Sequence, residues 1–147
     1  MNYYPKKPVK SFLDLEVYQK LLAAAVVIVK RTRDRPDPSE ITKNLHECVL
    51  SLPIKIAAAH SVRFGERDQS IRILEDVMMG CNKVVVYLEQ FRDLYHTNDN
   101  DDLGTDFFEE QIKNILMVRS KVFRLQKSWK KFMMESNTFA MSLNQKN

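Results

Sequence analysis

The residues best suited to chemistry are the cations of the stretch VRSKVFRLQKSWKKF, residues 118–132. This stretch carries six Lys or Arg residues and no acid, and apolar side chains are interleaved with the cations. Lysine and arginine form charge-assisted hydrogen bonds with phosphate oxygens and attract polyanions in general. The chemistry that this pattern offers is electrostatic binding, and three settings fit it: a solvated helix face, a membrane-surface helix, or a surface that holds a nucleic acid.

A helical projection at about 100° per residue separates the cations from the apolar side chains. One face carries a predicted core stripe of Ile115, Val118, Val122, Leu125, Trp129, Phe132 and Met133. The opposite face carries Lys113, Lys121, Arg124, Lys127 and Lys131, with Arg119 and Lys130 at its margin. A second group of cations, around the second predicted connection, extends this set by Arg63, Arg67 and Arg72.

The sign of these charges decides between the three settings. Solvated helix faces usually mix signs, because opposite charges at i, i+4 stabilise a helix and like charges destabilise it. The apolar face is needed for a protein core and is not free to enter lipid, which disfavours a membrane surface. A nucleic acid would relieve the repulsion between the cations, so we interpret the basic face as a nucleic-acid surface that contacts phosphates without reading sequence.

Other chemistries lack their residue patterns. His46, His60 and His96 lie on different predicted segments, and no Glu-x-x-His pair of the di-iron bundles occurs. Cys48 lies two residues from His46, a spacing that places the two side chains on different helix faces. Neither a glycine-rich phosphate loop nor a G-x-S-x-G motif is present. We therefore predict no enzyme, no metal and no cofactor.

Cysteine usage and hydropathy indicate the compartment. Cys48 and Cys81 are the only cysteines, they form no C-x-x-C motif, and both fall on predicted apolar faces, as expected of free thiols in a reducing environment. No signal peptide is recognised, and the longest apolar run, residues 21–29, is shorter than the ~20 residues that span a bilayer. We expect a cytoplasmic protein with no membrane partner.

The chain that positions these residues is predicted to be helical. Its 147 residues contain only three glycines and five prolines, which disfavours a turn-rich sheet. Hydrophobic periodicity predicts helices at about 13–33, 38–61, 68–96 and 106–135, and Ser11 with Asp14 resembles a capping box at the first. Residues 136–147 lack periodicity and are expected to fray. The fold class is all-α, a single domain over residues 1–147 with the up-down-up-down topology of a four-helix bundle.

The first predicted helix is apolar on nearly every side. One stripe contains Leu15, Tyr18, Leu22, Ala25, Val26 and Val29, and a second contains Leu21, Ala24, Val27 and Ile28. A single bundle covers one stripe only, so we expect the second to form a subunit interface. Charge is also distributed unevenly along the chain. Residues 68–112 hold eleven acidic residues and three Lys or Arg, whereas residues 113–147 hold one acidic residue and eight Lys or Arg. Subunits with one acidic and one basic surface could assemble into a ring in which the acidic third helix faces the basic surface of a neighbour.

Three short motifs resemble a known family. The opening SFLDLEVYQKLL is similar to that of the bacterial four-helix-bundle proteins encoded in intervening sequences of large-subunit ribosomal RNA genes, through Phe12, Asp14, Leu15, Val17, Tyr18 and Gln19. A second match, to a Ser-x-Pro-x-x-Ile-Ala stretch, uses Ser51, Pro53, Ile56 and Ala57. Gly80 matches a glycine in the third helix. Where that family usually continues Asn-Ile-Ala-Glu-Gly, this chain has KIAAA at residues 55–59.

A related branch resembles the chain in its basic fourth helix with a tryptophan near the end, as at Trp129. These proteins are the accessory variability determinants (Avd) of diversity-generating retroelements. The resemblance implies a homopentameric ring of four-helix bundles that binds RNA or DNA and a reverse transcriptase during mutagenic copying. The alternative is a bundle of the intervening-sequence family that binds only proteins, with the basic face docked on an acidic partner.

Overall fold

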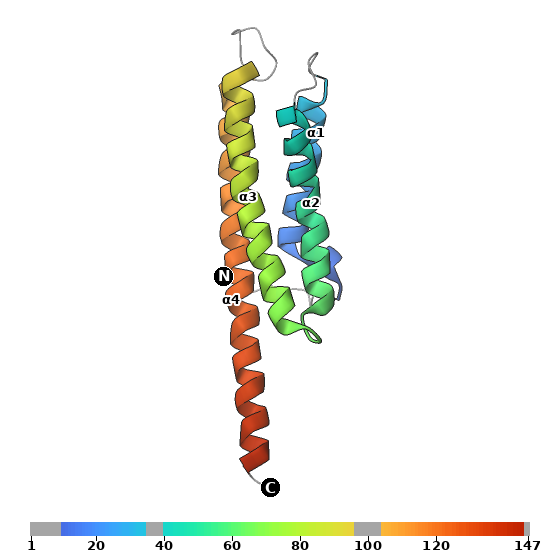
Figure 1. Cartoon of the computed structure of the whole chain (residues 1–147), viewed down its shortest axis with the longest axis vertical. Helices are drawn as coiled ribbons and strands as arrows, with labels where there is room; N and C mark the ends of the chain where they lie inside the picture. Colours follow the sequence, from blue (N-terminus) through green and yellow to red (C-terminus); the bar gives the residue numbers. More distant parts are fainter. Residues whose placement is uncertain (1–9, 35–39, 96–103, 146–147) are drawn as a thin grey trace, which may run out of the picture.

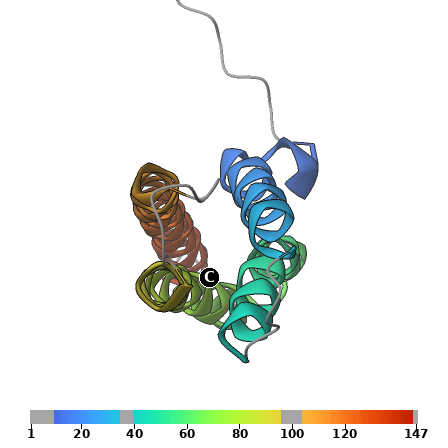
Figure 2. The same cartoon turned by 90° about the horizontal axis from the view of Figure 1, so that it is seen from above.

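Every described segment of this computed structural model is organised around α-helices. The structure describes residues 10–34, 40–95 and 104–145, and no strand occurs among them. A short 3-10 helix, Phe12–Asp14, precedes the four helices α1 (Glu16–Thr32), α2 (Glu40–Val62), α3 (Arg67–Tyr95) and α4 (Thr105–Gln145). Successive helices run in opposite directions (Figure 1), and viewed from above they follow one another around a square (Figure 2). The prediction of an all-α fold with four packed helices is confirmed. No helix in the described ranges is both long and apolar enough to cross a membrane.

The first helix begins later than predicted because the capping box closes a 3-10 turn. The Ser11 Oγ accepts a hydrogen bond from the Leu13 N–H at 3.2 Å, and the Asp14 carboxylate accepts one from the Ser11 N–H at 3.3 Å. Leu15 is then extended, with φ −72° and ψ 126°, and α1 starts at Glu16. The predicted start of the second helix at about residue 38 and the predicted end of the third at residue 96 lie outside the described residues.

All four helices contribute to one apolar core. Its fully buried side chains include Leu21, Ile28, Leu45, Leu52, Ile56, Leu74, Leu88, Phe91, Phe108 and Ile115. Contact is most extensive between α2 and α3, followed by α3 and α4, and least extensive between α1 and α4. The side of the bundle between α1 and α4 is therefore its most weakly packed side.

The assignment of the two stripes of α1 was wrong. Leu21, Ala24 and Ile28, predicted to face another subunit, lie in the core of this chain, and of the predicted interface residues only Val27 is exposed. Leu22, Val26 and Val27, each about 40% exposed, form the outward apolar side instead. The physical reason is that a helix apolar on every side gives no hydrophobic period from which to choose a core face.

Gly80 allows α2 and α3 to approach closely. A Cβ atom placed on Gly80 would lie 2.5 Å from Leu52 Cδ2, well inside van der Waals contact. Beside it, the Cys48 thiol donates a hydrogen bond to the Gly80 carbonyl oxygen at 3.6 Å. The glycine matched to the family motif thus has a packing role between the two helices that contact each other most extensively.

The fourth helix continues past the rest of the bundle. It has 41 residues against 29 in α3, which makes it about 18 Å longer at about 1.5 Å per residue. Figure 1 shows its C-terminal part running beyond the ends of the other helices. The backbone is helical to Gln145, so the prediction of a frayed tail from residue 136 was wrong. The segment contains no Gly or Pro, which explains why nothing in it ends the helix.

Two histidines, His46 and His60, form side-chain hydrogen bonds within the bundle. The Thr32 hydroxyl donates to the Ile28 carbonyl at 2.7 Å, so it accepts the hydrogen bond from His46 Nε2, which lies 2.6 Å away. His60 is buried, and its Nδ1 accepts from Arg63 Nη1 at 3.1 Å. Burial lowers the pKa of both imidazoles below 6.5, and the charge of Arg63 lowers that of His60 further.

The effect of replacing Gly80 by Ala on the free energy of unfolding should depend on the side chain at position 52. In the native chain the added methyl group clashes with Leu52, at a cost of about 1–3 kcal/mol that offsets the ~1 kcal/mol gained in helix propensity. In a Leu52→Val background the clash is absent, and Gly80→Ala should increase the free energy of unfolding. A double-mutant cycle by urea denaturation should give a coupling on the order of 1 kcal/mol, and a coupling of zero would contradict the close approach.

The free energy of unfolding should fall as pH is lowered through 6.5. The folded-state pKa of His46 and His60 is depressed, so the unfolded chain takes up protons at higher pH than the folded chain does. The stabilisation is present above pH 6.5 and is lost as pH falls through the folded-state pKa. Urea denaturation at about pH 7.5 and about pH 5.5 measures the effect. The His46→Gln, His60→Gln variant should show a smaller difference, and an unchanged difference would rule out these histidines as its cause.

Candidate nucleic-acid interface

The cationic stripe of α4 faces away from the core. Ile115, Val118 and Val122 bury one side of α4 against the rest of the bundle. About half a turn around the helix axis from them, four cations are exposed to solvent with no acid between the first and the last: Lys113, Arg124, Lys127 and Lys131. Two acids, Glu109 and Glu110, are exposed in the turn before Lys113. We refer to the four cations as the outer stripe. They extend over 19 residues, from 113 to 131, which corresponds to about 27 Å of helix.

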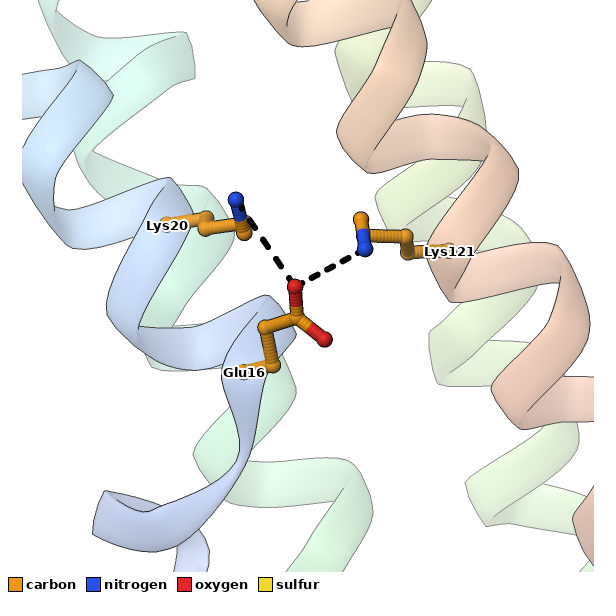
Figure 3. Close-up of polar contacts among 3 residues, drawn as sticks. All are labelled: Glu16, Lys20 and Lys121. Carbon is orange, nitrogen blue, oxygen red and sulfur yellow. Dashed lines mark hydrogen bonds and ion pairs between the residues drawn. The ribbon is translucent and has the colours of Figure 1, made fainter. Parts of the chain in front are cut away.

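Lys121 differs from the outer stripe because it has a partner. Its Nζ lies 2.8 Å from Glu16 Oε1 on α1, and Lys20 lies 3.7 Å from the same oxygen (Figure 3). The hydrogen bond from Lys121 is the main reason that the pKa of Glu16 is lowered. Glu16 therefore neutralises part of the basic surface, at the weakly packed side between α1 and α4.

Arg119 lies off the stripe and close to the core. Its Nε is buried without a hydrogen-bond partner in the part of the chain that the structure describes. Its charge acts on the Cys81 thiol, but burial is the larger effect and raises the pKa of that thiol to about 12. Cys48, whose pKa burial also raises, and Cys81 are free cysteines. Only the Nε of Arg119 is buried in this way and the residue as a whole is half-buried, so a phosphate contact through its Nη groups stays a prediction.

Hydrogen bonds to His60 near the end of α2 hold Arg63 beside α4. Its Nη1 donates to the His60 carbonyl oxygen at 2.6 Å as well as to His60 Nδ1, and its guanidinium lies 4.2 Å from the centre of the Phe64 ring. Together with Phe64 and three α4 residues it lines a pocket of about 270 Å³, the others being Ser128, Trp129 and Phe132. Arg63 is thus the one cation of the second predicted group that the structure places against α4.

The remaining two cations of that group lie in a mixed-charge surface. Arg67 and Arg72 line a hollow at the start of α3 together with Glu66 and Asp68, and Arg72 Nε donates to the Asp68 carbonyl at 3.4 Å. Carboxylates beside these arginines weaken the attraction of the site for phosphate.

Sequence reasoning overlooked the aromatic side chains of the pocket. Phe132 was assigned to the core stripe, yet it is 52% exposed and its ring centre lies 6.2 Å from that of Phe64, which is 60% exposed. Helical projection cannot reveal this, because Phe132 lies on the core side of α4 but beyond the point where α2 ends. The signal available was Phe64 itself, an aromatic residue in the polar connection SVRFGERD.

Comparison with models of known protein families matched no family, and searches of curated proteins and of solved structures also returned no match. Among the residues that the structure describes, no group of three or more His, Cys, Asp or Glu could hold a metal ion. The charged and aromatic surface of α4 is therefore the candidate functional site.

Replacement of Glu16 by Gln should increase affinity for nucleic acid. The change frees Lys121, and one added phosphate contact steepens the dependence of log Kobs on log salt by about 0.9. The folded state should lose no more than about 1 kcal/mol, because exposed ion pairs contribute little. Fluorescence anisotropy with a labelled RNA at several salt concentrations measures both quantities.

The control for this experiment is Glu47→Gln. Glu47 lies 4.0 Å from Lys43 within α2, so the variant removes the same charge from an ion pair away from the stripe. Equal effects of the two variants would show that net charge alone, and not Lys121, sets the affinity.

Proposed function

We propose that this protein is a non-enzymatic nucleic-acid-binding accessory protein that acts with a reverse transcriptase, in the manner of the accessory variability determinants that its motifs resemble. The observation that carries the proposal is the outer stripe, four exposed cations on one side of one helix with no acid on the helix between the first and the last. A duplex of about 27 Å presents about sixteen phosphate charges at one per ~1.7 Å, so a helix of this length can contact several of them.

The exposed side of α1 supports self-association. Leu22, Val26 and Val27 form an apolar surface with no charged side chain between Lys20 and Lys30. Apolar surfaces of this kind are usually covered by another molecule. We propose a second copy of the chain as that molecule, within a homo-oligomeric ring that the resemblance suggests is a pentamer. A ring would also repeat the outer stripe around its circumference and multiply the phosphate contacts.

A protein-binding function without nucleic acid is the second candidate. It is favoured by the same apolar side of α1 and would place the outer stripe against an acidic protein partner. The two candidates differ in salt dependence and selectivity, because phosphate contacts are lost steeply with salt and are shared among many nucleic acids.

Charge reversal on the stripe should weaken the binding of RNA. The variant Arg124→Glu, Lys127→Glu, Lys131→Glu should bind a labelled structured RNA much more weakly at low salt, with a salt slope shallower by about 2.7 for three lost contacts. The matched control is Lys43→Glu, Lys55→Glu, Lys83→Glu, which changes the net charge of +4 by the same amount on α2 and α3.

Both variants should keep the helical circular dichroism of the native protein, since the three stripe residues are exposed. Failure of the native protein to bind RNA or DNA at low salt would overturn the proposed function. An equal loss in the control variant would show that overall charge, and not the stripe, attracts the nucleic acid.

A further inference from the structure

The pocket at the end of α2 has the size of a site for one ring system. Its volume of about 270 Å³ lies just below the ~300–1,000 Å³ typical of pockets for drug-sized ligands. Its lining residues come from the connection after α2 and from α4, at the end of the bundle where Figure 1 shows α4 continuing past the other helices.

Aromatic rings form most of its wall. Phe64 and Phe132 meet edge to face, with an interplanar angle of 62°, and both remain more than half exposed. Trp129 is half-buried below them and packs at 6.5 Å from His60. Exposed aromatic faces are the platforms on which proteins stack unpaired bases, at about 1–3 kcal/mol per base.

The charge around the pocket is complementary to a phosphate chain. None of the five lining residues is acidic, and Arg63 is held over Phe64 by its two hydrogen bonds to His60. Lys131 of the outer stripe is exposed on the adjacent turn of α4, about 60° around the helix axis from the pocket residue Ser128 at about 100° per residue. An apolar side chain of a protein partner would leave these cations unused, whereas a nucleotide uses both the aromatic walls and the cations.

We infer that this pocket takes an unpaired base of a nucleic-acid strand whose phosphates follow the outer stripe. The inference rests on the proposed function and deepens it, because it predicts a preference for single-stranded over duplex substrates. In a duplex the base is paired and stacked, and placing it in the pocket requires extrusion at a cost of a few kcal/mol.

Trp129, the single tryptophan of the chain, makes the test direct. The probes are a labelled oligothymidylate and a strand of equal length whose bases are replaced by abasic sites. The oligothymidylate should quench the fluorescence of Trp129 and bind about fivefold or more tightly than the abasic strand, the ratio that one stacked base supplies. A duplex of the same length should leave the fluorescence unchanged.

Two variants separate the pocket from the stripe. Phe64→Ala and Phe132→Ala should each weaken binding of the oligothymidylate about fivefold or more and leave the abasic strand unaffected. The matched control is Phe123→Ala, which removes a ring that is 49% exposed on the same helix but outside the pocket. Circular dichroism should show all three variants folded, since each side chain is about half exposed or more.

The possible failures are distinguishable. Equal affinity for the two single strands, with no quenching, would overturn the inference and leave the proposed function intact. Tight binding of an acidic peptide at the pocket, unaffected by oligothymidylate, would assign it to a protein partner and also overturn the inference. If neither strand binds at low salt, the proposed function fails and the base site fails with it.

Discussion

Burial of the apolar side of α4 fixes where its charges must lie. Ile115, Val118 and Val122 are inaccessible to solvent and pack with Phe108 into the common core. Since side chains about half a turn away point outward, the four cations of the outer stripe are exposed on one side of the helix. The hydrophobic effect thus concentrates positive charge on one surface, although like charges repel one another there.

The packing of the helices also places an acidic side chain beside one of these cations. Glu16 belongs to the first turn of α1, yet the antiparallel packing of the bundle places it beside Lys121, 105 residues away in the chain. The basic surface consequently contains two kinds of cation: those of the outer stripe, which are exposed to solvent, and Lys121, which shares a carboxylate with Lys20. A phosphate group would compete with Glu16 only for the second kind.

The sequence predicts local features of this protein well and contacts between distant segments poorly. The four helices and the outward direction of the stripe follow from hydrophobic period. The two stripes of α1 were not separated correctly because its apolar residues give no preference, and members of both stripes are buried in the core. Glu16, Gln19 and Lys30 cluster on one side and mark the outward face. The Glu16–Lys121 pair and the pocket at Phe64 depend on which helix ends meet, which no single helix encodes. Phe132 shows the same limit, because its place on the apolar side of α4 was predicted correctly but it lies beyond the point where α2 ends and is half exposed.

The continuity of α4 has a mechanical consequence. Because no glycine or proline interrupts its 41 residues, the segment inside the bundle and the segment that projects beyond it behave as one rod. The outer stripe and the pocket residues Trp129 and Phe132 lie on that rod. A molecule that binds the projecting turns of α4 would therefore act on these surfaces through the helix. A rotation of the projecting end would turn the cations and the aromatic pocket wall together.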